Sequence, residues 1–138
     1  MATDAGYSGT PLPRKLGIKP GDRVLLLSAP EPFERVTLGE LPEGVRVAHR
    51  LSGKAGVIVS FHTARADLAR RMPKLRAAME PAAGLWIAWP KRASRVETDL
   101  TEDVVRELAL ANTLVDNKVA AIDETWSGLR LVIRLRDR

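Results

Sequence analysis

Short apolar runs divide the chain into predicted strands. Arg23–Ser28 contains four consecutive apolar residues, and Val57–Phe61 and Leu85–Trp89 are apolar at nearly every position. A strand that does not alternate between apolar and polar residues is covered on both faces, as are the interior strands of α/β sheets. Val45–His49 alternates more regularly, which predicts an edge strand.

Between Phe61 and Gly84 the apolar positions take a helical spacing. Four of them are separated by 4, 3 and 4 residues: Leu68, Met72, Leu75 and Met79. This spacing places them on one stripe of a helix, facing the sheet. Pro73 interrupts the segment and is expected to kink the helix or divide it in two.

The C-terminal part predicts a second helix followed by an antiparallel hairpin. Thr101 is a good N-cap for that helix. Its expected buried stripe is Leu100, Val104, Leu108 and Ala111. Lys118–Ile122 and Leu129–Leu135 then form strands on either side of the loop Asp123–Gly128. The short loop implies antiparallel pairing, and the alternation in the last strand predicts one solvent-exposed face.

The segment before the first strand predicts two local structures. Pro11–Leu16 is expected to form one helical turn that Gly17 closes, since glycine tolerates the left-handed conformation at a helix end. Pro20-Gly21 suits a type II turn, with proline fixing φ and glycine supplying a positive φ. We assign residues 1–22 to an N-terminal extended and turn segment.

The order of these elements, with a short helical link expected between the first and second strands, predicts an α/β fold. Strand–helix–strand crossovers place helices on both faces of a central sheet. We expect residues 23–138 to form one three-layer, Rossmann-like mixed sheet, mostly parallel, with a C-terminal antiparallel hairpin. One connection leaves two alternatives, because Arg50–Gly56 is too short for a helical crossover. The strands Val45–His49 and Val57–Phe61 are either antiparallel or joined by a tight extended return.

Composition narrows the class of protein. The chain has 138 residues, of which 45% are hydrophobic and 28% charged, as expected for one globular domain with a buried core. The lack of cysteine excludes disulfides, thiolate zinc sites and cysteine nucleophiles. With only His49 and His62, a histidine-rich metal site is not expected, although carboxylates could hold magnesium. We predict no metal site.

The sequence shows no targeting signal. Met1–Leu12 is polar, unlike a signal peptide. The longest apolar stretch, around Ala82–Trp89, is far shorter than the roughly 20 residues that span a bilayer. We expect a cytoplasmic, bacterial-type protein that does not contact membranes.

Charge is unevenly distributed along the chain, whose net charge is +5. Arg65–Arg95 contains eight basic and two acidic residues, and Glu97–Glu124 reverses these numbers. This polarity could steer an anionic partner, or it could reflect two oppositely charged, solvated helices, which is the reading we favour. Nucleic-acid binding through Arg70, Arg71, Lys74 and Arg92 is not excluded, but no recognised binding motif supports it.

The order of strands and helices resembles the second half of the S-adenosylmethionine-dependent methyltransferase fold. The resemblance implies a cofactor site at a glycine-rich turn after the first strand. Here that turn is Ser28-Ala29-Pro30-Glu31-Pro32, with two prolines and no glycine. Ala48-His49-Arg50 stands where a ribose-binding carboxylate is expected. The fold is therefore expected without its cofactor signature, and fold alone does not carry function.

Several longer motifs are similar to a small bacterial family, domain-of-unknown-function family 3052. They occur in order along the chain: Gly6-Tyr7-Ser8-Gly9-Thr10-Pro11-Leu12, Lys15-Leu16-Gly17-Ile18, Leu85-Trp86-Ile87-Ala88-Trp89-Pro90-Lys91, Thr98-Asp99-Leu100-Thr101 and Asp123-Glu124-Thr125-Trp126-Ser127-Gly128-Leu129. This resemblance brings no activity or catalytic residue with it. Pro13–Val24 is also similar to a segment of swapped-hairpin DNA-binding regulators, but a helical turn, a Pro-Gly turn and a strand explain it equally well.

Ligands in open α/β sheets collect at the carboxyl ends of parallel strands. Four segments are predicted to meet there: Ser28–Pro32, His62-Thr63, Trp89–Ser94 and Asp123–Ser127. Their candidate ligand-binding residues are His62, Trp89, Lys91, Arg92, Asp123, Glu124 and Trp126.

Each candidate also has a structural interpretation. His62 could be a base, or could cap the following helix or face solvent. The tryptophans could stack on a ligand or pack in the core. The basic pair could hold a phosphate or carboxylate, or be solvated, and the adjacent acids need not converge.

The sequence does not identify catalytic residues or a cofactor. It contains no Gly-x-Ser-x-Gly elbow and no glycine–lysine phosphate loop. Our first hypothesis is a non-catalytic or degenerate methyltransferase-like domain that binds a small molecule or a protein partner at the rim of the sheet. The alternatives are a small enzyme with an atypical site, including one linked to S-adenosylmethionine, and a basic nucleic-acid-associated protein.

Overall fold

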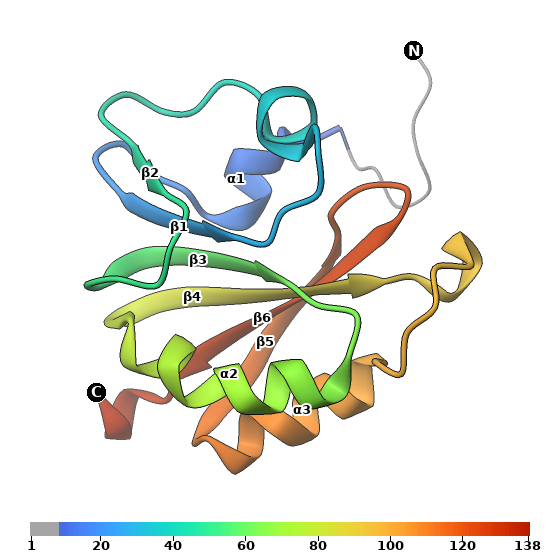
Figure 1. Cartoon of the computed structure of the whole chain (residues 1–138). Coiled ribbons are helices and arrows are strands. Elements are labelled where there is room, and N and C mark those ends of the chain that lie inside the picture. Colours follow the sequence, from blue (N-terminus) through green and yellow to red (C-terminus); the bar gives the residue numbers. More distant parts are fainter. Residues whose placement is uncertain (1–8) are drawn as a thin grey trace.

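A computed structural model describes residues 9–138 of the chain. One mixed sheet of six strands runs through them in the order β2-β1-β3-β4-β6-β5 (Figure 1). Their bounds are β1 Arg23–Leu27, β2 Arg46–Ala48, β3 Ala55–Phe61, β4 Met79–Pro90, β5 Leu114–Ala121 and β6 Trp126–Ile133. The predicted α/β class, with a mostly parallel sheet and a C-terminal antiparallel hairpin, is confirmed. The part of the predicted N-terminal segment before Gly9 lies outside the described residues.

The ambiguous connection between the second and third strands has a simple outcome. Both β2 and β3 run parallel to β1 and flank it on opposite sides. The chain therefore returns from β2 to β3 without a helix, as the second alternative proposed. Arg23, at the start of β1, holds this return loop, because its guanidinium donates hydrogen bonds to the carbonyl oxygens of Ser52 at 2.7 Å and Lys54 at 3.0 Å.

The two faces of the sheet have separate hydrophobic clusters. Helices α2 (Arg65–Ala77) and α3 (Glu102–Ala111) cover one face, over residues such as Leu75 and Leu85. The short helix α1 (Leu12–Leu16) and the π-helical turn η1 (Phe33–Leu38) cover part of the other face, over residues such as Trp86. Figure 1 shows this three-layer arrangement.

The first long helix differs in two respects from its prediction. Leu68, Met72 and Leu75 form its buried stripe, but Met79 already belongs to β4. Pro73 does not divide the helix, which runs continuously from Arg65 to Ala77. Pro73 is exposed, so its ring projects away from the sheet and needs no space in the core.

The second long helix begins as predicted, but its buried stripe is shifted. The Thr101 side chain accepts a hydrogen bond from the backbone N–H of Val104 at 3.2 Å, which confirms the N-cap. Val105 and Ala109 are fully buried, whereas Ala111 is exposed. The helix is therefore rotated toward the side of Val105 and Ala109.

The C-terminal hairpin is longer than predicted. β5 begins at Leu114, and β6 begins at Trp126, inside the predicted loop. β6 lies between β4 and β5, so both of its edges are paired. Val132, on the face predicted to be solvent-exposed, is buried, and Arg130 on the same face is half-buried. Leu135 is not part of the strand. It lies in a 3₁₀ turn, η3 (Leu135–Asp137), and is 81% exposed.

The turn predictions before the first strand are confirmed. Gly17 closes α1 at φ 83°. Gly21 has φ 80°, and the Asp22 N–H bonds to the Lys19 carbonyl, as in a type II turn. Within the described residues, no helix is long and apolar enough to cross a membrane.

Candidate functional site

The rim at the carboxyl ends of β3 and β4 brings together three of the predicted segments. Pro90 of β4 pairs with Trp126 of β6, and the Lys91 N–H donates to the Thr125 carbonyl at 2.7 Å. His62 follows β3, and its N–H bonds to the Ala88 carbonyl on β4. The segments around His62, Lys91 and Thr125 are therefore neighbours, as the topology predicted.

The fourth segment, Ser28–Pro32, borders a crevice at the ends of β1 and β2. The crevice has a volume of about 630 Å³ and is also lined by Glu34 and His49. Ser28 has φ 59°, a left-handed conformation that favours glycine. The His49 Nε2 and Glu34 Oε1 atoms are 2.7 Å apart, and this contact ties the end of β2 to η1.

His62 forms the centre of a buried hydrogen-bond chain. Its side chain is fully buried, with Nδ1 at 2.8 Å from Asp67 Oδ2 on α2 and Nε2 at 2.7 Å from Ser60 Oγ on β3. A carboxylate only accepts hydrogen bonds, so Nδ1 carries the proton in the neutral ring and the Ser60 hydroxyl donates to Nε2. The predictions that His62 caps the helix or faces solvent are therefore wrong.

The charge state of His62 is set by opposing effects. Burial lowers the pKa of the imidazole below its usual value, because the charged form loses hydration. The hydrogen bond to Asp67 acts in the opposite direction, and the nearby charge of Arg71 lowers the pKa further. The net result favours a neutral ring.

The Ser60–His62–Asp67 chain has the hydrogen-bond order that activates serine nucleophiles. Ser60 is nevertheless completely buried, so its hydroxyl cannot reach a substrate. The chain links β3 to the first turn of α2. The sequence analysis missed it, although Ser60 and His62 share one face of a strand and Asp67 lies in the first turn of the following helix.

The acids and aromatic residues of the rim have structural contacts. Asp123 Oδ1 accepts hydrogen bonds from the N–H groups of Thr125 and Trp126, both at 2.8 Å, which shapes the β5–β6 turn. Trp126 packs edge-on against Phe61 with ring centroids 5.0 Å apart. Trp89 is buried on the opposite face, with α2 and α3. The two tryptophans therefore do not face a common site.

The basic candidates lie next to the turn. Lys91 is half-buried, whereas Arg92 is exposed at the start of the 3₁₀ turn η2 (Arg92–Ser94). Lys91 is close enough to Lys15 of α1 for its charge to lower the pKa of that lysine, after burial and the charge of Lys118. The structure thus adds α1 to this part of the rim.

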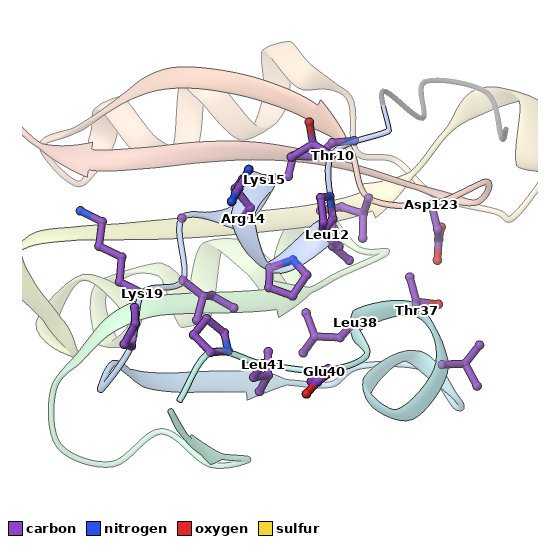
Figure 2. A pocket seen from close by; sticks show the side chains of 18 of the residues that line it. Thr10, Leu12, Arg14, Lys15, Lys19, Thr37, Leu38, Glu40, Leu41 and Asp123 are labelled. Carbon is purple, nitrogen blue, oxygen red and sulfur yellow. The ribbon is translucent and has the colours of Figure 1, made fainter. Parts of the chain in front are cut away.

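A groove of about 1220 Å³ lies on the face opposite α2 and α3. Figure 2 shows α1 on one side and η1 with the following loop on the other, with Lys19 toward one end and Asp123 toward the other. Leu12 and Leu38 contribute to its apolar floor, and Val36 at its edge is 66% exposed. Among the predicted candidates, only Asp123 and Glu124 line this groove.

The sequence analysis assigned no role in binding to the segments that form most of this groove. Residues 10–20 were interpreted as turns, and only a short helical link was expected between the first and second strands, where η1 lies, because neither segment has a long periodic pattern. Within residues 9–138, no cluster of three or more histidine, aspartate or glutamate side chains is arranged to hold a metal ion.

The fold places the chain in the class of methyltransferase-like α/β domains. A S-adenosylmethionine-dependent methyltransferase from Aquifex aeolicus has a TM-score of 0.60 and 16% identity, with 88% of this chain and 87% of that chain covered. Magnesium protoporphyrin IX methyltransferase from Synechocystis, with bound cofactor, has a TM-score of 0.58 and 13% identity, with 89% and 74% covered.

A third similar structure is the 1,6-didemethyltoxoflavin N1-methyltransferase of Burkholderia thailandensis, with bound S-adenosylhomocysteine. Its TM-score is 0.59 at 15% identity, and 87% of this chain and 73% of that chain are covered. At this identity, the likeness concerns the fold alone. No family model and no curated protein matches the chain, so membership of family 3052 stays a prediction.

Proposed function

We propose that this chain is a non-catalytic, methyltransferase-like domain that binds a small amphipathic organic molecule in the groove between α1 and η1. The carrying observation is the groove itself, which is somewhat larger than the range of about 300–1,000 Å³ that is typical of ligand pockets. Its apolar floor suits the body of such a molecule. The cation and carboxylate toward its two ends suit polar groups.

The proposal also rests on the chemistry of the crevice at β1 and β2. A glycine-rich turn lets the backbone approach a cofactor closely, but the turn here contains Pro30 and Pro32. His49 and Glu34, which both line the crevice, are in contact with each other at 2.7 Å. Both features oppose a bound nucleoside at this position.

A second candidate function is an enzyme linked to S-adenosylmethionine. The specific observation in its favour is that solved structures of similar fold contain this cofactor or S-adenosylhomocysteine. The crevice of about 630 Å³ lies at the corresponding strand ends. This candidate requires the turn after β1 to accept the cofactor without glycine.

Calorimetry separates the two candidates. We expect no micromolar binding of S-adenosylmethionine or S-adenosylhomocysteine to the folded chain. The matched variant His49→Ala/Glu34→Ala opens the crevice and tests whether this pair alone prevents binding. Micromolar affinity of the unmodified chain for either compound would support the enzyme and contradict the proposal.

The groove can be tested with the amphipathic anion 1-anilinonaphthalene-8-sulfonate, whose fluorescence rises on apolar surfaces. We expect saturable binding to the folded chain and its loss in Val36→Trp, where the new ring fills the groove. Val119→Trp is the matched control, because Val119 is 55% exposed but lies on β5 outside the groove. Equal binding by both variants would contradict a groove site.

A further inference from the structure

Four basic side chains from distant parts of the sequence form a continuous row across β5 and β6. Lys118 of β5 is the cross-strand partner of Arg130 on β6, so both side chains lie on the face opposite α3. Lys118 Nζ donates to the Lys15 carbonyl on α1 at 3.1 Å. At the other end, Arg138 lies close enough to Arg130 to influence its charge. We call these four residues the basic row.

The Arg130 side chain lies against the neighbouring strand β4, where Gly84 has no side chain. Its guanidinium lies directly over Gly84 of β4, where a Cβ atom would collide with it. Its one side-chain hydrogen bond within residues 9–138 is long, from Nη1 to Asn117 Oδ1 at 3.4 Å. The other N–H donors of this half-buried guanidinium have no hydrogen-bond partner among the described residues.

No carboxylate among residues 9–138 forms an ion pair with the basic row. Asp116, the nearest acid along β5, points to the other face and binds Arg106 of α3. By contrast, Arg70 on α2 is paired with Asp67. Lys15 Nζ and Arg138 Nε, like Lys118 Nζ, donate hydrogen bonds to backbone carbonyl oxygens, which do not cancel their charge. The positive charge of the row is therefore not neutralised by an ion pair within residues 9–138, whereas α2 partly neutralises its own.

The electrostatics of the row are unfavourable in the isolated chain. Burial lowers the pKa of Arg130, and the charge of Arg138 lowers it further. Burial likewise lowers the pKa of Lys15, with a further contribution from Lys118. Like charges that are close together and partly desolvated are characteristic of sites that bind an opposite charge.

The extent of the basic row indicates which class of anion it would bind. The row extends over two strands, α1 and the C-terminal turn, and Lys118, Arg130 and Arg138 line neither the groove nor the crevice. A ligand with repeated negative groups fits such a row better than one small anion does. The described aromatic side chains are buried or, for Trp126, packed against Phe61, so they offer no platform for unpaired bases.

We propose that the basic row binds the phosphate backbone of double-stranded nucleic acid without reading its sequence. Duplex DNA carries about one negative charge per 1.7 Å of axis, and contacts to phosphates alone carry no sequence information. Lys15 of the row also lines the groove, whereas Lys118 and Arg130 do not, so variants of these two residues test this inference separately from the groove proposal.

The test measures fluorescence anisotropy of a short labelled DNA duplex over a series of salt concentrations. Four phosphate contacts predict a slope of about −3.6 for the logarithm of affinity against that of salt. Lys118→Gln/Arg130→Gln removes two contacts. It should lower affinity by about 60-fold at 0.1 M salt, since each contact contributes about eightfold there, and reduce the slope by about 2.

The control pair Arg50→Gln/Lys54→Gln removes the same charge from the exposed loop between β2 and β3 and should retain most of the affinity. An equal loss of DNA affinity in both double variants would show that only net charge matters, and it would overturn the proposal. Tighter binding of the single strand than of the duplex would also overturn it. If the double variant melts early, Lys118→Gln alone, at an exposed position, should still give an eightfold loss.

Discussion

Ser28 lies at the point where the chain leaves β1, with φ 59°. A residue with a Cβ atom is destabilised in this conformation by about 1–2 kcal/mol relative to its usual regions. We expect Ser28→Gly to raise the free energy of unfolding by about 1 kcal/mol, measured by urea denaturation. Ala29→Gly is the control, since Ala29 does not have a positive φ and its replacement should lower stability by about 0.5–1 kcal/mol. Destabilisation by Ser28→Gly would show that the hydroxyl matters more than the strain.

His62 makes stability depend on pH. Burial lowers its pKa in the folded state, so the unfolded chain binds the proton more readily. The stabilisation that the neutral His62 ring contributes is complete above the pKa of histidine in the unfolded chain, about 6.5. It is lost as the pH falls below that value. Denaturation at about pH 7.5 and about pH 5.5 should show a smaller loss of stability in His62→Gln than in the unmodified chain. His49→Gln retains His62 and should keep the loss, and an equal loss in all three proteins would contradict this account.

The sequence predicted where residues of the candidate site lie only when the order of strands alone determines their position. The segments of Lys91 and Thr125 were expected to meet at one rim. Lys91 follows β4 and Thr125 precedes β6, these two strands pair, and the 2.7 Å hydrogen bond between the two residues agrees with that expectation. The contacts of His62 with Ser60 and Asp67 depend on how α2 rotates on the sheet. Hydrophobic spacing sets that rotation only approximately, so a histidine expected to be exposed is buried.

At the scale of elements, the sequence predicted what hydrophobic patterns encode. Apolar runs identified the interior strands, and Thr101 marked the start of α3. The pattern could not show that β2 and β3 flank β1, because apolar runs identify strands but not the order in which they pair. The turn η1 agrees with the short helical link expected between the first two strands, whereas the groove beside it has no periodic signal and was not predicted.

Two glycines within strands test how closely the elements pack. A Cβ on Gly128 would lie 2.8 Å from Ile122 Cδ1 and 3.0 Å from the buried Trp86 ring. We expect Gly128→Ala to lower the free energy of unfolding by about 1–3 kcal/mol through overpacking. Gly84→Ala meets only the movable guanidinium of Arg130 and should change stability by less than about 1 kcal/mol. Chemical denaturation measures both, and a reversed order would contradict the packing described for β6.

At the scale of the whole molecule, the basic and acidic segments of the sequence contribute helices to the same face of the sheet. The basic segment contributes α2 and the acidic segment contributes α3, and both helices lie on the same face of the sheet. Arg65 and Glu107 approach to 3.9 Å across them. Within residues 9–138, this one ion pair links the two oppositely charged helices, and the row on β5 and β6 makes none.

The two hydrophobic clusters share the strands of one sheet, and this predicts one cooperative unit. Leu16 on α1 and Leu75 on α2 are both fully buried, on opposite faces. Replacing either by alanine should cost about 2–5 kcal/mol. Strands β1, β3, β4 and β6 contribute to both clusters. Within each variant, tryptophan fluorescence and far-ultraviolet circular dichroism should therefore report the same decrease in the unfolding midpoint. Leu16→Ala could instead produce an early transition and leave a second one at the original midpoint. In that case α1 would unfold as a separate unit, and the boundary predicted at residue 22 would separate two parts that unfold independently.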